Sequence, residues 1–447
     1  MSQHKPKTYI LSLGCAKNQV NSEQMAHILF ASGYDEASCP EQAEVVIVNT
    51  CGFIESAKQE AIDELLRMSE LKTTGKLKYL IAAGCLSERY KSELRAGLPE
   101  VDACIGVGSY GAVAEVVDGL LSGDGTQTER FSPPESYDDN APRRILGKNP
   151  AWAYIKIAEG CDNKCAFCAI PQIRGKMRSR ELEDIVAEAE NLAKSGVREL
   201  VVIAQDTTKY GQDLYGRPSL DRLLRRLNEI TELRWIRVHY MYPELVTRGL
   251  LDTFSEGEKL LPYFDIPLQH VSAKVLKKMR RVGNFSSHYN LVQEIRSRLP
   301  RAVIRTSFIT GLPYEQRQEF EELLSFVRLA KLEHAGVFQY SPEEGTESSL
   351  MKAPAPYTAR RRKEAIERLQ DAVTGSFHEG RVGQTETVII EECEDGLYLA
   401  RSYAEAPEVD GYIYVSSENA LSPGDFAEVL ITKNDGGILF AETVRVL

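Results

Sequence analysis

The sequence predicts an α/β protein made of a doubly wound parallel sheet, a partial (β/α)6 barrel and a small β-barrel. Over most of the chain, apolar strand-like runs alternate with helical patterns, which is typical of parallel sheets covered by helices. From residue 381 onward, short strand-like runs are separated by Gly and Asp-Gly turns, which favours a compact β-barrel. A chain of 447 residues has room for about three such domains.

The N-terminal part contains three apolar runs, TYILSLG (8–14), EVVIVNT (44–50) and KYLIAAG (78–84). Helical patterns separate them, so we expect neighbouring parallel strands in a domain that covers residues 1–121. Residues 122–150 are rich in Gly, Pro and charged side chains and have no apolar periodicity. We therefore predict that they form a linker.

Six further strand-like runs follow residue 150, with helical segments between them. They are AYIKIA, ELVVIAQD, WIRVHYM, YFDIPLQ, VIRTSFITG and GVFQYS. Six strand–helix units within residues 151–357 predict a partial barrel, whose chemistry would lie at the carboxyl ends of the strands. A basic helix at residues 358–380 then connects this barrel to a five-stranded β-barrel at residues 381–447.

The composition, with 43% hydrophobic and 27% charged residues, is that of a soluble globular protein. No apolar run is long enough to cross a membrane, and the N-terminus lacks the apolar core of a signal peptide. We therefore expect a cytoplasmic protein, in which nine cysteines indicate metal binding or catalysis rather than disulfides. Three of them, Cys39, Cys104 and Cys393, are interpreted as small buried hydrophobic residues.

Three cysteines lie close together directly after the first predicted barrel strand. The run EGCDNKCAFCAIP spaces Cys161, Cys165 and Cys168 as CxxxCxxC. Three thiolates on one loop can bind three irons of a 4Fe-4S cluster and leave the fourth iron open to a small molecule. A structural zinc site is the alternative, but zinc prefers four closed ligands. Only His239 and His270 could supply a fourth ligand, and only after folding.

A second set of three cysteines ends the three N-terminal strands. Cys15, Cys51 and Cys85 follow these strands in LSLGC, VIVNTC and IAAGC. Loops at the carboxyl ends of neighbouring parallel strands converge, so three thiols delivered there could bind a second cluster with an open iron. Three unrelated buried cysteines are the alternative.

The CxxxCxxC spacing after a barrel strand resembles the radical S-adenosylmethionine superfamily. The motifs SLGCAKNQVNSE, NTCGF and AAGC resemble the methylthiotransferases, and this resemblance covers essentially the whole chain. It implies a central radical-SAM barrel and a TRAM-like C-terminal β-barrel. It also implies two 4Fe-4S clusters, with S-adenosylmethionine as radical source and methyl donor. The implied reaction inserts sulfur into an unactivated C–H bond and methylates that sulfur.

The resemblance also implies which residues bind S-adenosylmethionine. Phe167, the aromatic residue before the last cysteine of the triad, would lie near the adenine. The other implied contacts are on barrel strands: Gln205, Asp206, Gln269, Arg305 and Ser307. Ordinary polar residues at strand ends are the alternative interpretation, also for His270. In GLPYEQ, Tyr314 stands where the family usually has glycine. No catalytic residue beyond the cluster cysteines is predicted.

The charge of the C-terminal segment bears on the two substrates of this family, an adenine of tRNA and an aspartate of a ribosomal protein. Residues 381–447 contain 4 Lys and Arg and 13 Asp and Glu, so they carry −9 of the chain's net charge of −11. An RNA-binding module needs cations against phosphates, whereas this charge suits a basic ribosomal protein. The acids expected to face that partner are Glu391, Glu392, Glu394, Asp395, Glu405, Glu408 and Asp410.

The runs LGCAKNQVNSE, CDNKCAFCAIPQIRGK and RSYAEAPEVDG resemble the branch that acts on ribosomal protein S12. We therefore expect methylthiolation of the β-carbon of one aspartate of S12. The expected partners are S12 or the small ribosomal subunit and an electron donor, with no membrane and no direct nucleic-acid binding through the C-terminal barrel. The alternatives are a methylthiotransferase that acts on tRNA adenosine and a non-catalytic iron–sulfur protein that docks on ribosomes.

Overall fold

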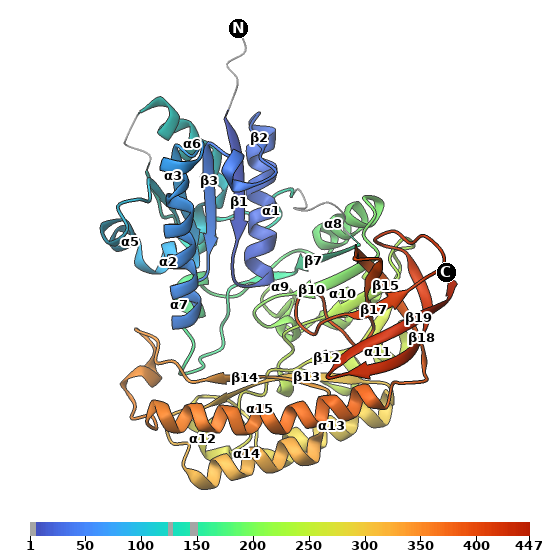
Figure 1. The fold of residues 1–447 in the computed structure, drawn as a ribbon. Helices are drawn as coiled ribbons and strands as arrows, with labels where there is room; N and C mark the ends of the chain where they lie inside the picture. Colours follow the sequence, from blue (N-terminus) through green and yellow to red (C-terminus); the bar gives the residue numbers. More distant parts are fainter. Residues whose placement is uncertain (1–5, 124–127, 144–150) are drawn as a thin grey trace. The chain divides into compact units, whose positions relative to one another are not determined.

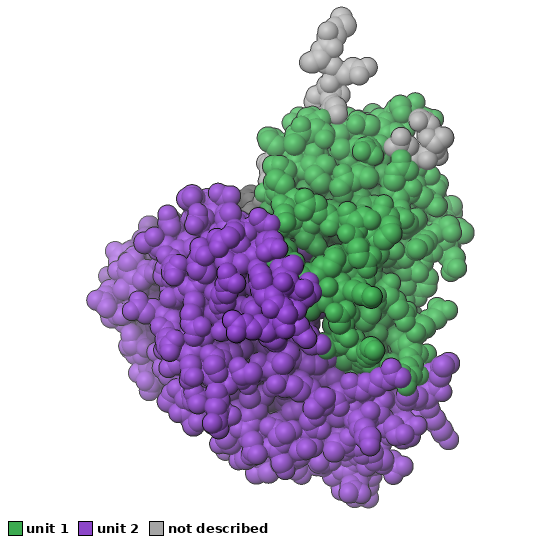
Figure 2. Space-filling view, turned by 180° about the vertical axis from the view of Figure 1, so that it is seen from behind, with its two compact units in different colours: residues 1–146, 158–180, 341–349 green, residues 147–157, 181–340, 350–447 purple. Residues whose placement is uncertain are grey.

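The computed structural model of the chain describes residues 6–123, 128–143 and 151–447. The chain forms two compact units, which Figure 2 shows in different colours. The first unit contains residues 1–146, 158–180 and 341–349, and the second contains residues 147–157, 181–340 and 350–447. Two short segments from later in the chain therefore belong to the same unit as the N-terminal residues.

The first unit is built on a six-stranded parallel sheet with the strand order β2-β1-β3-β4-β5-β6. Figure 1 labels β1, β2 and β3 of this sheet. The strands are β1 (Lys7–Ser12), β2 (Asp35–Glu36), β3 (Val45–Thr50), β4 (Tyr79–Gly84), β5 (Ala103–Ile105) and β6 (Glu129–Arg130). The three predicted N-terminal strands are thus confirmed as β1, β3 and β4, which lie side by side.

Helices cover both faces of this sheet, as a doubly wound sheet requires. Helices α1 (Ala16–Ala31) and α6 (Val113–Ser122) pack in one apolar core, and α2 (Glu55–Ser69) and α5 (Ser92–Gly97) pack in the other. Successive residues of β3 alternate between the two cores because side chains of a strand point to opposite faces. The other α-helices and strands described in the first unit are α3 (Leu71–Thr74), α4 (Cys85–Tyr90), β8 (Ala158–Glu159), α7 (Ile170–Arg174) and β9 (Arg178–Ser179).

The segment predicted as a linker contributes a strand to the sheet. Within residues 122–150, β6 pairs in parallel with β5, with Cys104 opposite Glu129. A strand of two residues has no periodicity that a sequence pattern could reveal. The rest of that prediction falls partly on residues 124–127 and 144–150, which lie outside the described residues.

The second unit contains the predicted partial barrel, a parallel sheet with the order β14-β13-β12-β11-β10-β7. The strands are β7 (Trp152–Lys156), β10 (Glu199–Ile203), β11 (Trp235–Val238), β12 (Leu260–Asp265), β13 (Val303–Thr310) and β14 (His334–Gln339). The helices between them are α8 (Leu182–Lys194), α9 (Gln212–Tyr215), α10 (Leu220–Asn228), α11 (Arg248–Glu256), α12 (Ala273–Lys278), α13 (Phe285–Arg298) and α14 (Arg317–Ala330). Each of these strands falls on one of the six predicted runs, so all six predicted strands are confirmed. Strands that are neighbours in the sheet are also neighbours along the sequence.

The last part of the chain is a closed barrel with the strand order β15-β16-β17-β19-β18, as predicted. Helix α15 (Pro356–Glu379) leads into it (Figure 1). The strands are β15 (Thr385–Glu394), β16 (Leu397–Ser402), β17 (Ile413–Ser416), β18 (Phe426–Asp435) and β19 (Ile438–Val446). Apolar side chains of all five strands fill its interior.

Buried ion pairs hold this barrel to the parallel sheet of the second unit. Arg401 of β16 donates to Glu199 of β10 at 2.7 Å and to Glu391 of β15. Arg237 of β11 donates to the other oxygen of Glu199, also at 2.7 Å. Glu199, Arg237 and Arg401 are fully buried, so these charges stabilise each other without water.

The prediction that these C-terminal acids face a basic partner is therefore wrong for three of them. Glu391 pairs with Arg401, Glu405 pairs with Arg381, and Asp410 pairs with Arg305, and the side chains of all three acids are buried. Each acid neutralises an arginine that the segment or the neighbouring sheet presents. The acids that remain exposed are Glu392, Glu394, Asp395 and Glu408.

The three cysteines that were interpreted as buried differ from one another. Cys104 is fully buried, Cys39 is half-buried and Cys393 is exposed, so the interpretation holds for Cys104 and is wrong for Cys393. None of the helices that the structure describes is both long enough and apolar enough to span a bilayer.

Candidate functional site

Cys15, Cys51 and Cys85 lie at the carboxyl ends of three neighbouring strands of the first unit. Cys15 precedes α1, Cys51 follows β3, and Cys85 begins α4 directly after β4. A side chain at Gly14 would place its Cβ 2.6 Å from the Cβ and 3.1 Å from the Sγ of Cys51. The loop after β1 therefore needs glycine at residue 14 to lie against Cys51.

A single buried amide, that of Asn18, connects the loops that carry the three thiols. Its Nδ2 donates to the carbonyl oxygens of Leu13 at 2.8 Å and Thr50 at 3.0 Å, next to the loops of Cys15 and Cys51. Its Oδ1 accepts from the Sγ of Cys85 at 3.8 Å. Asn18 thus fixes all three strand ends. Sequence reasoning missed it because no local pattern reports contacts among three separate strands.

Arg174 extends this network to the CxxxCxxC loop that carries Cys161, Cys165 and Cys168. Its guanidinium donates to Oδ1 of Asn18 at 2.6 Å and to Glu159 at 2.9 Å, and the side chain is buried. Glu159 in turn accepts from the backbone N–H of Gly160 at 3.2 Å, directly before Cys161. Arg174 therefore ties the start of the CxxxCxxC loop to the strand ends of the N-terminal sheet, within the first unit.

The pKa values of the N-terminal thiols show that they influence one another. Burial raises the pKa of Cys51 to about 12, and negative charge on Cys85 and Cys15 adds to the rise. Burial also raises the pKa of Cys85, against the opposing effect of Arg174. Burial alone would raise the pKa of Cys15, but Lys17 and Arg174 outweigh it and lower that pKa. Ionising all three thiols together therefore requires nearby positive charge, and Arg174 supplies part of it.

The CxxxCxxC loop runs between β8 and α7, also in the first unit. The N–H of Cys161 donates to the carbonyl of Gly175 at 3.1 Å, and the N–H of Cys168 donates to the carbonyl of Cys165 at 3.1 Å. Gly160 has a φ of +77°, and a Cβ there would lie 2.0 Å from the Lys176 carbonyl oxygen, so the loop begins on an obligatory glycine. All three cysteines and Phe167 are half-buried, which leaves them accessible to a ligand.

Each triad consists of three thiols, the donor atoms that iron–sulfur clusters use. Among the described residues, no three His, Cys, Asp or Glu side chains are grouped closely enough for one metal ion. A cubane cluster places each thiolate on a different iron, so its ligands need not converge on one point. His270, named above as a possible zinc ligand, is buried in the second unit, and its Nδ1 accepts from the backbone N–H of Ser272 at 2.9 Å.

A buried carboxylate holds residues 341–349 in the first unit beside Cys51. Glu343 accepts from Lys58 at 3.1 Å and from Arg89 at 2.8 Å, and Arg89 also donates to the carbonyl of Gly52 at 2.9 Å. Burial would raise the pKa of Glu343, but its hydrogen bonds with Ser341, Arg89 and Lys58 lower it. The segment after β14 thereby supports the loop that carries Cys51.

Four of the residues predicted to contact S-adenosylmethionine lie near the carboxyl ends of the strands in the second unit. Gln205 and Asp206 follow β10, and Asp206 accepts from the Thr208 hydroxyl at 2.5 Å. Gln269 has a φ of +66° and is fixed against β13, since its N–H donates to the Ser307 carbonyl at 2.8 Å. These positions line the end of the sheet at which such barrels carry out chemistry.

Arg305, the remaining barrel residue predicted to contact S-adenosylmethionine, lies beside two carboxylates. It lies 3.4 Å from Asp265 of β12 and 3.3 Å from Asp410 of the C-terminal segment. Burial raises the pKa of Asp265, against the effect of Arg305. Arg305 therefore has a structural role in joining the sheet to residues after β16, which its place in the sequence did not reveal.

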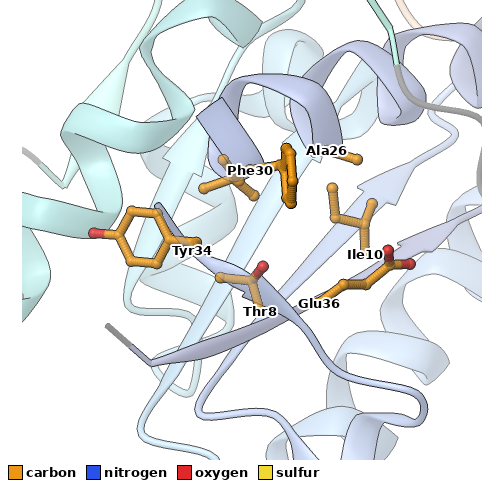
Figure 3. Close-up of a pocket in the computed structure, with 7 residues that line it drawn as sticks. Thr8, Ile10, Ala26, Phe30, Tyr34 and Glu36 are labelled. Carbon is orange, nitrogen blue, oxygen red and sulfur yellow. The ribbon is translucent and has the colours of Figure 1, made fainter. Parts of the chain in front are cut away.

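A small pocket in the first unit lies between α1 and the edge of the sheet (Figure 3). Its walls are formed by Thr8, Ile10, Ala26, Leu29, Phe30, Tyr34 and Glu36. Thr8 and Glu36 pair near the amino-terminal end of β1, whereas the thiols follow the carboxyl ends. The pocket is thus separate from the cysteine site and contains no thiol.

Comparison with known proteins gives matches to three family models and to full-length relatives. The models are "Uncharacterized protein family UPF0004" at residues 7–106, the radical SAM superfamily at 155–327 and the TRAM domain at 382–444. A protein of Thermoanaerobacter sp. (strain X514) is 45% identical over 95% of this chain and 96% of its own length. One of Clostridioides difficile (strain 630) is 42% identical over 95% and 96%. Both are described as ribosomal protein uS12 methylthiotransferase RimO.

Solved structures share the fold at low sequence identity. The radical S-adenosylmethionine methyltransferase TsrM from Kitasatospora setae, with cobalamin and a 4Fe-4S cluster bound, has a TM-score of 0.55 and 12% identity, covering 91% of this chain and 82% of that chain. The two relatives above match this chain over nearly their full length at 45% and 42% identity, far above the 12% of the TsrM structure. The relatives therefore determine the family. The chain belongs to the ribosomal protein uS12 methylthiotransferases, a family of radical SAM enzymes.

Proposed function

We propose that this enzyme methylthiolates the β-carbon of one aspartate in ribosomal protein uS12. In this reaction a C–H bond of the substrate is replaced by a C–S bond, and the new sulfur carries a methyl group. The observation that supports it best is the identity of 42–45% with uS12 methylthiotransferases over 95% of the chain. A substrate of this kind would place the enzyme in the cytoplasm with the ribosomes, next to a one-electron donor.

We further propose that the two cysteine triads hold two 4Fe-4S clusters. Cys161, Cys165 and Cys168 would hold one, and the N-terminal triad the other, each through three thiolates. When bound, a cluster and S-adenosylmethionine supply a hydrogen-abstracting radical, and a second S-adenosylmethionine supplies the methyl group. Support comes from the chain itself, since Asn18 fixes the three N-terminal strand ends and Arg174 places a cation beside these thiols.

The residues near the carboxyl ends of the barrel strands would bind and orient S-adenosylmethionine. Gln205, Asp206, Gln269 and Ser307 offer hydrogen-bonding groups there, and Phe167 on the cysteine loop offers a ring to the adenine. Arg305 belongs to the same predicted set, although two carboxylates hold its guanidinium. Substitution of Gln269 by Ala should raise the concentration of S-adenosylmethionine required for cleavage without changing the iron content.

Mass spectrometry of uS12 tests the proposed reaction directly. The protein should carry one methylthio group on an aspartate in cells with the gene and lack it in cells without the gene. Purified enzyme, S-adenosylmethionine, a reductant and a sulfide source should restore the modification. Methylthiolated adenosine in tRNA, with unmodified uS12, would contradict the proposal.

A further inference from the structure

A basic surface on the second unit has no part in the proposed chemistry. It consists of Lys277 and Lys278 of α12, Tyr314 before α14, and Tyr357 and Arg361 in the first turns of α15. All five side chains are exposed, and the rings of Tyr314 and Tyr357 are 41% and 64% exposed. We call these five residues the α12–α15 surface.

The α12–α15 surface is built on segments that follow the carboxyl ends of the barrel strands. α12 follows β12, and Tyr314 lies in the turn after β13. The start of α15 packs against this turn, since Arg362 pairs with Glu315 at 2.9 Å and a Cβ at Gly311 would lie 2.4 Å from that of Ala359. The surface therefore flanks the end of the sheet at which a substrate would enter.

The cations of this surface are not neutralised by the protein. Within the part of the chain that the structure describes, Lys277, Lys278 and Arg361 have no carboxylate partner, whereas the neighbouring Arg317 and Arg360 pair with Glu321 and Glu364. The chain as a whole carries −11. A group of unpaired cations on such an acidic protein indicates an anionic partner.

Two of the cations stand beside exposed aromatic rings. The Nζ of Lys278 is 4.7 Å from the ring centre of Tyr314, and the guanidinium of Arg361 is 5.7 Å from that of Tyr357. Bases of single-stranded RNA stack on aromatic rings while neighbouring cations bind the phosphates. An acidic protein segment would use the cations alone, so the two rings favour RNA.

The backbone at Tyr314 supports a role for its ring. Its φ is +68°, a conformation that glycine adopts freely and a bulky residue rarely does. The turn is held by the buried Glu315, which accepts from the Thr310 hydroxyl at 2.9 Å and from the N–H of Gly311 at 2.6 Å. A tyrosine kept in this conformation with its ring in solvent indicates that the ring itself is needed.

We propose that the α12–α15 surface binds ribosomal RNA next to the substrate, so that the enzyme acts on uS12 within an RNA-bound assembly. This inference rests on the proposed function, because it takes uS12 as the substrate. The RNA would lie beside the carboxyl ends of the barrel strands and help to present the uS12 segment there. The exposed acids of the C-terminal barrel would face away from phosphates toward basic protein.

Charge reversal tests whether the three cations of the α12–α15 surface bind RNA. The triple variant Lys277→Glu, Lys278→Glu, Arg361→Glu of the holoenzyme is compared with a control of equal charge change, Arg225→Glu, Arg298→Glu, Lys433→Glu. Arg225 and Arg298 lie in the last turns of α10 and α13, at the other end of the sheet, and Lys433 lies on β18. Probes are purified small ribosomal subunits, a fluorescent single-stranded RNA of mixed sequence and free uS12.

We expect the surface variant to bind subunits and RNA at least about tenfold more weakly than the control variant does. The slope of log affinity against log salt should fall by about 2, because three cations no longer displace counterions. Methylthiolation of free uS12 should proceed equally in both variants. Equal binding of RNA and subunits by the two variants would overturn the proposal.

Substitutions at Tyr314 distinguish a role of its ring in RNA binding from a role in the stability of the fold. Tyr314→Gly removes the ring and relaxes the backbone, so it should weaken RNA binding about tenfold while the melting temperature stays level or rises. Tyr314→Phe should keep RNA binding. Weaker binding to subunits with unchanged binding to RNA would overturn the RNA assignment and point to an acidic protein. If wild-type enzyme binds RNA but never modifies uS12, the proposed function fails and the RNA surface stands.

Discussion

Asn18 and Arg174 are the residues on which the arrangement of the thiols depends most. The amide of Asn18 contacts the three thiol-bearing strand ends, and Arg174 connects this amide to Glu159 before the CxxxCxxC loop. Neither residue is a cluster ligand in the proposed scheme. Both are buried, so a substitution that removes one partner leaves the others unsatisfied in a dry environment.

Replacing Arg174 by Gln should therefore destabilise the protein strongly. The change leaves the buried Glu159 carboxylate without its partner, which costs about 3–5 kcal/mol of unfolding free energy. Denaturation of the metal-free protein, monitored by circular dichroism, measures this. The control Arg95→Gln breaks a half-exposed pair of 3.5 Å with Glu129 and should cost less than about 1 kcal/mol. Similar losses in both variants would show that Arg174 does not organise a buried network.

Cysteine substitutions test the two triads separately. Anaerobic reconstitution should load about eight irons per chain, and replacement of Cys161, Cys165 and Cys168 by Ala should leave about four and abolish 5′-deoxyadenosine formation. Replacement of Cys15, Cys51 and Cys85 by Ala should also leave about four irons, but it should spare that cleavage and stop methylthiolation. Iron analysis and chromatography measure the outcomes. A methylthiolated product at the wild-type rate from the second variant would refute a sulfur-carrying role for this triad.

At the scale of elements, buried ion pairs join the C-terminal barrel to the parallel sheet of the second unit. Arg401 of β16 and Arg237 of β11 share Glu199 of β10. This ion-pair network forms only where the barrel meets the sheet, so an isolated barrel would lack it. Glu405 after β16 pairs with Arg381 before β15 inside the C-terminal segment itself. The C-terminal barrel should therefore be a fixed part of the second unit rather than a tethered module.

The pair of Glu405 with Arg381 predicts a specific dependence of stability on pH. Burial alone would raise the pKa of Glu405, but Arg381 and Ser402 lower it to about 2. Because the folded pKa lies below the unfolded value of about 4.3, this carboxylate stabilises the fold above about pH 4.3, and the contribution is lost as the pH falls toward 2.

Comparison of wild type with Glu405→Gln isolates this contribution. The wild type should be more stable by an amount of the order of 3 kcal/mol at pH 6, and the difference should shrink steadily below about pH 4.3. Urea denaturation at a series of pH values provides the measurement. A difference that stays constant from pH 6 to pH 3 would mean that Glu405 is not held as a carboxylate.

At the scale of the whole molecule, exposed acids and unpaired cations lie on different surfaces. Of the seven C-terminal acids expected to be exposed, Glu391, Glu405 and Asp410 neutralise internal arginines. Glu392, Glu394, Asp395 and Glu408 remain exposed. The α12–α15 surface carries the opposite sign, in the same unit.

Reversing the charge of exposed acids should affect binding, whereas reversing the charge of a buried acid should affect stability. Changing Glu392, Glu394 and Asp395 to Lys should weaken binding to free uS12 and reduce its salt dependence, with little change in melting temperature. Changing Glu391 to Lys should lower the melting temperature sharply, because it places two cations in contact inside the unit. Binding measured by anisotropy at several salt concentrations decides the first part. Unaltered affinity and salt dependence would reject the electrostatic attraction of uS12.

The sequence by itself determined the parts of this protein whose signals are local. Alternation of apolar strands and helices, turn residues after residue 381 and the CxxxCxxC spacing each lie within a short window, and they predicted the three folded parts and the loop of Cys161. Parallel strands also place their carboxyl ends at one edge, which was enough to expect that Cys15, Cys51 and Cys85 lie together.

Only the tertiary structure decided which polar groups meet. Arg174 reaches Asn18 across 156 residues, and Arg401 reaches Glu199 across 202 residues, so no local pattern reports either contact. The same holds for β6, which is too short for periodicity and is recognised only by its pairing with β5. Whether an acid faces solvent or an internal arginine depends on long-range packing. A charged side chain is stable in the interior only when it is paired with an opposite charge, and composition gives only the number of charges.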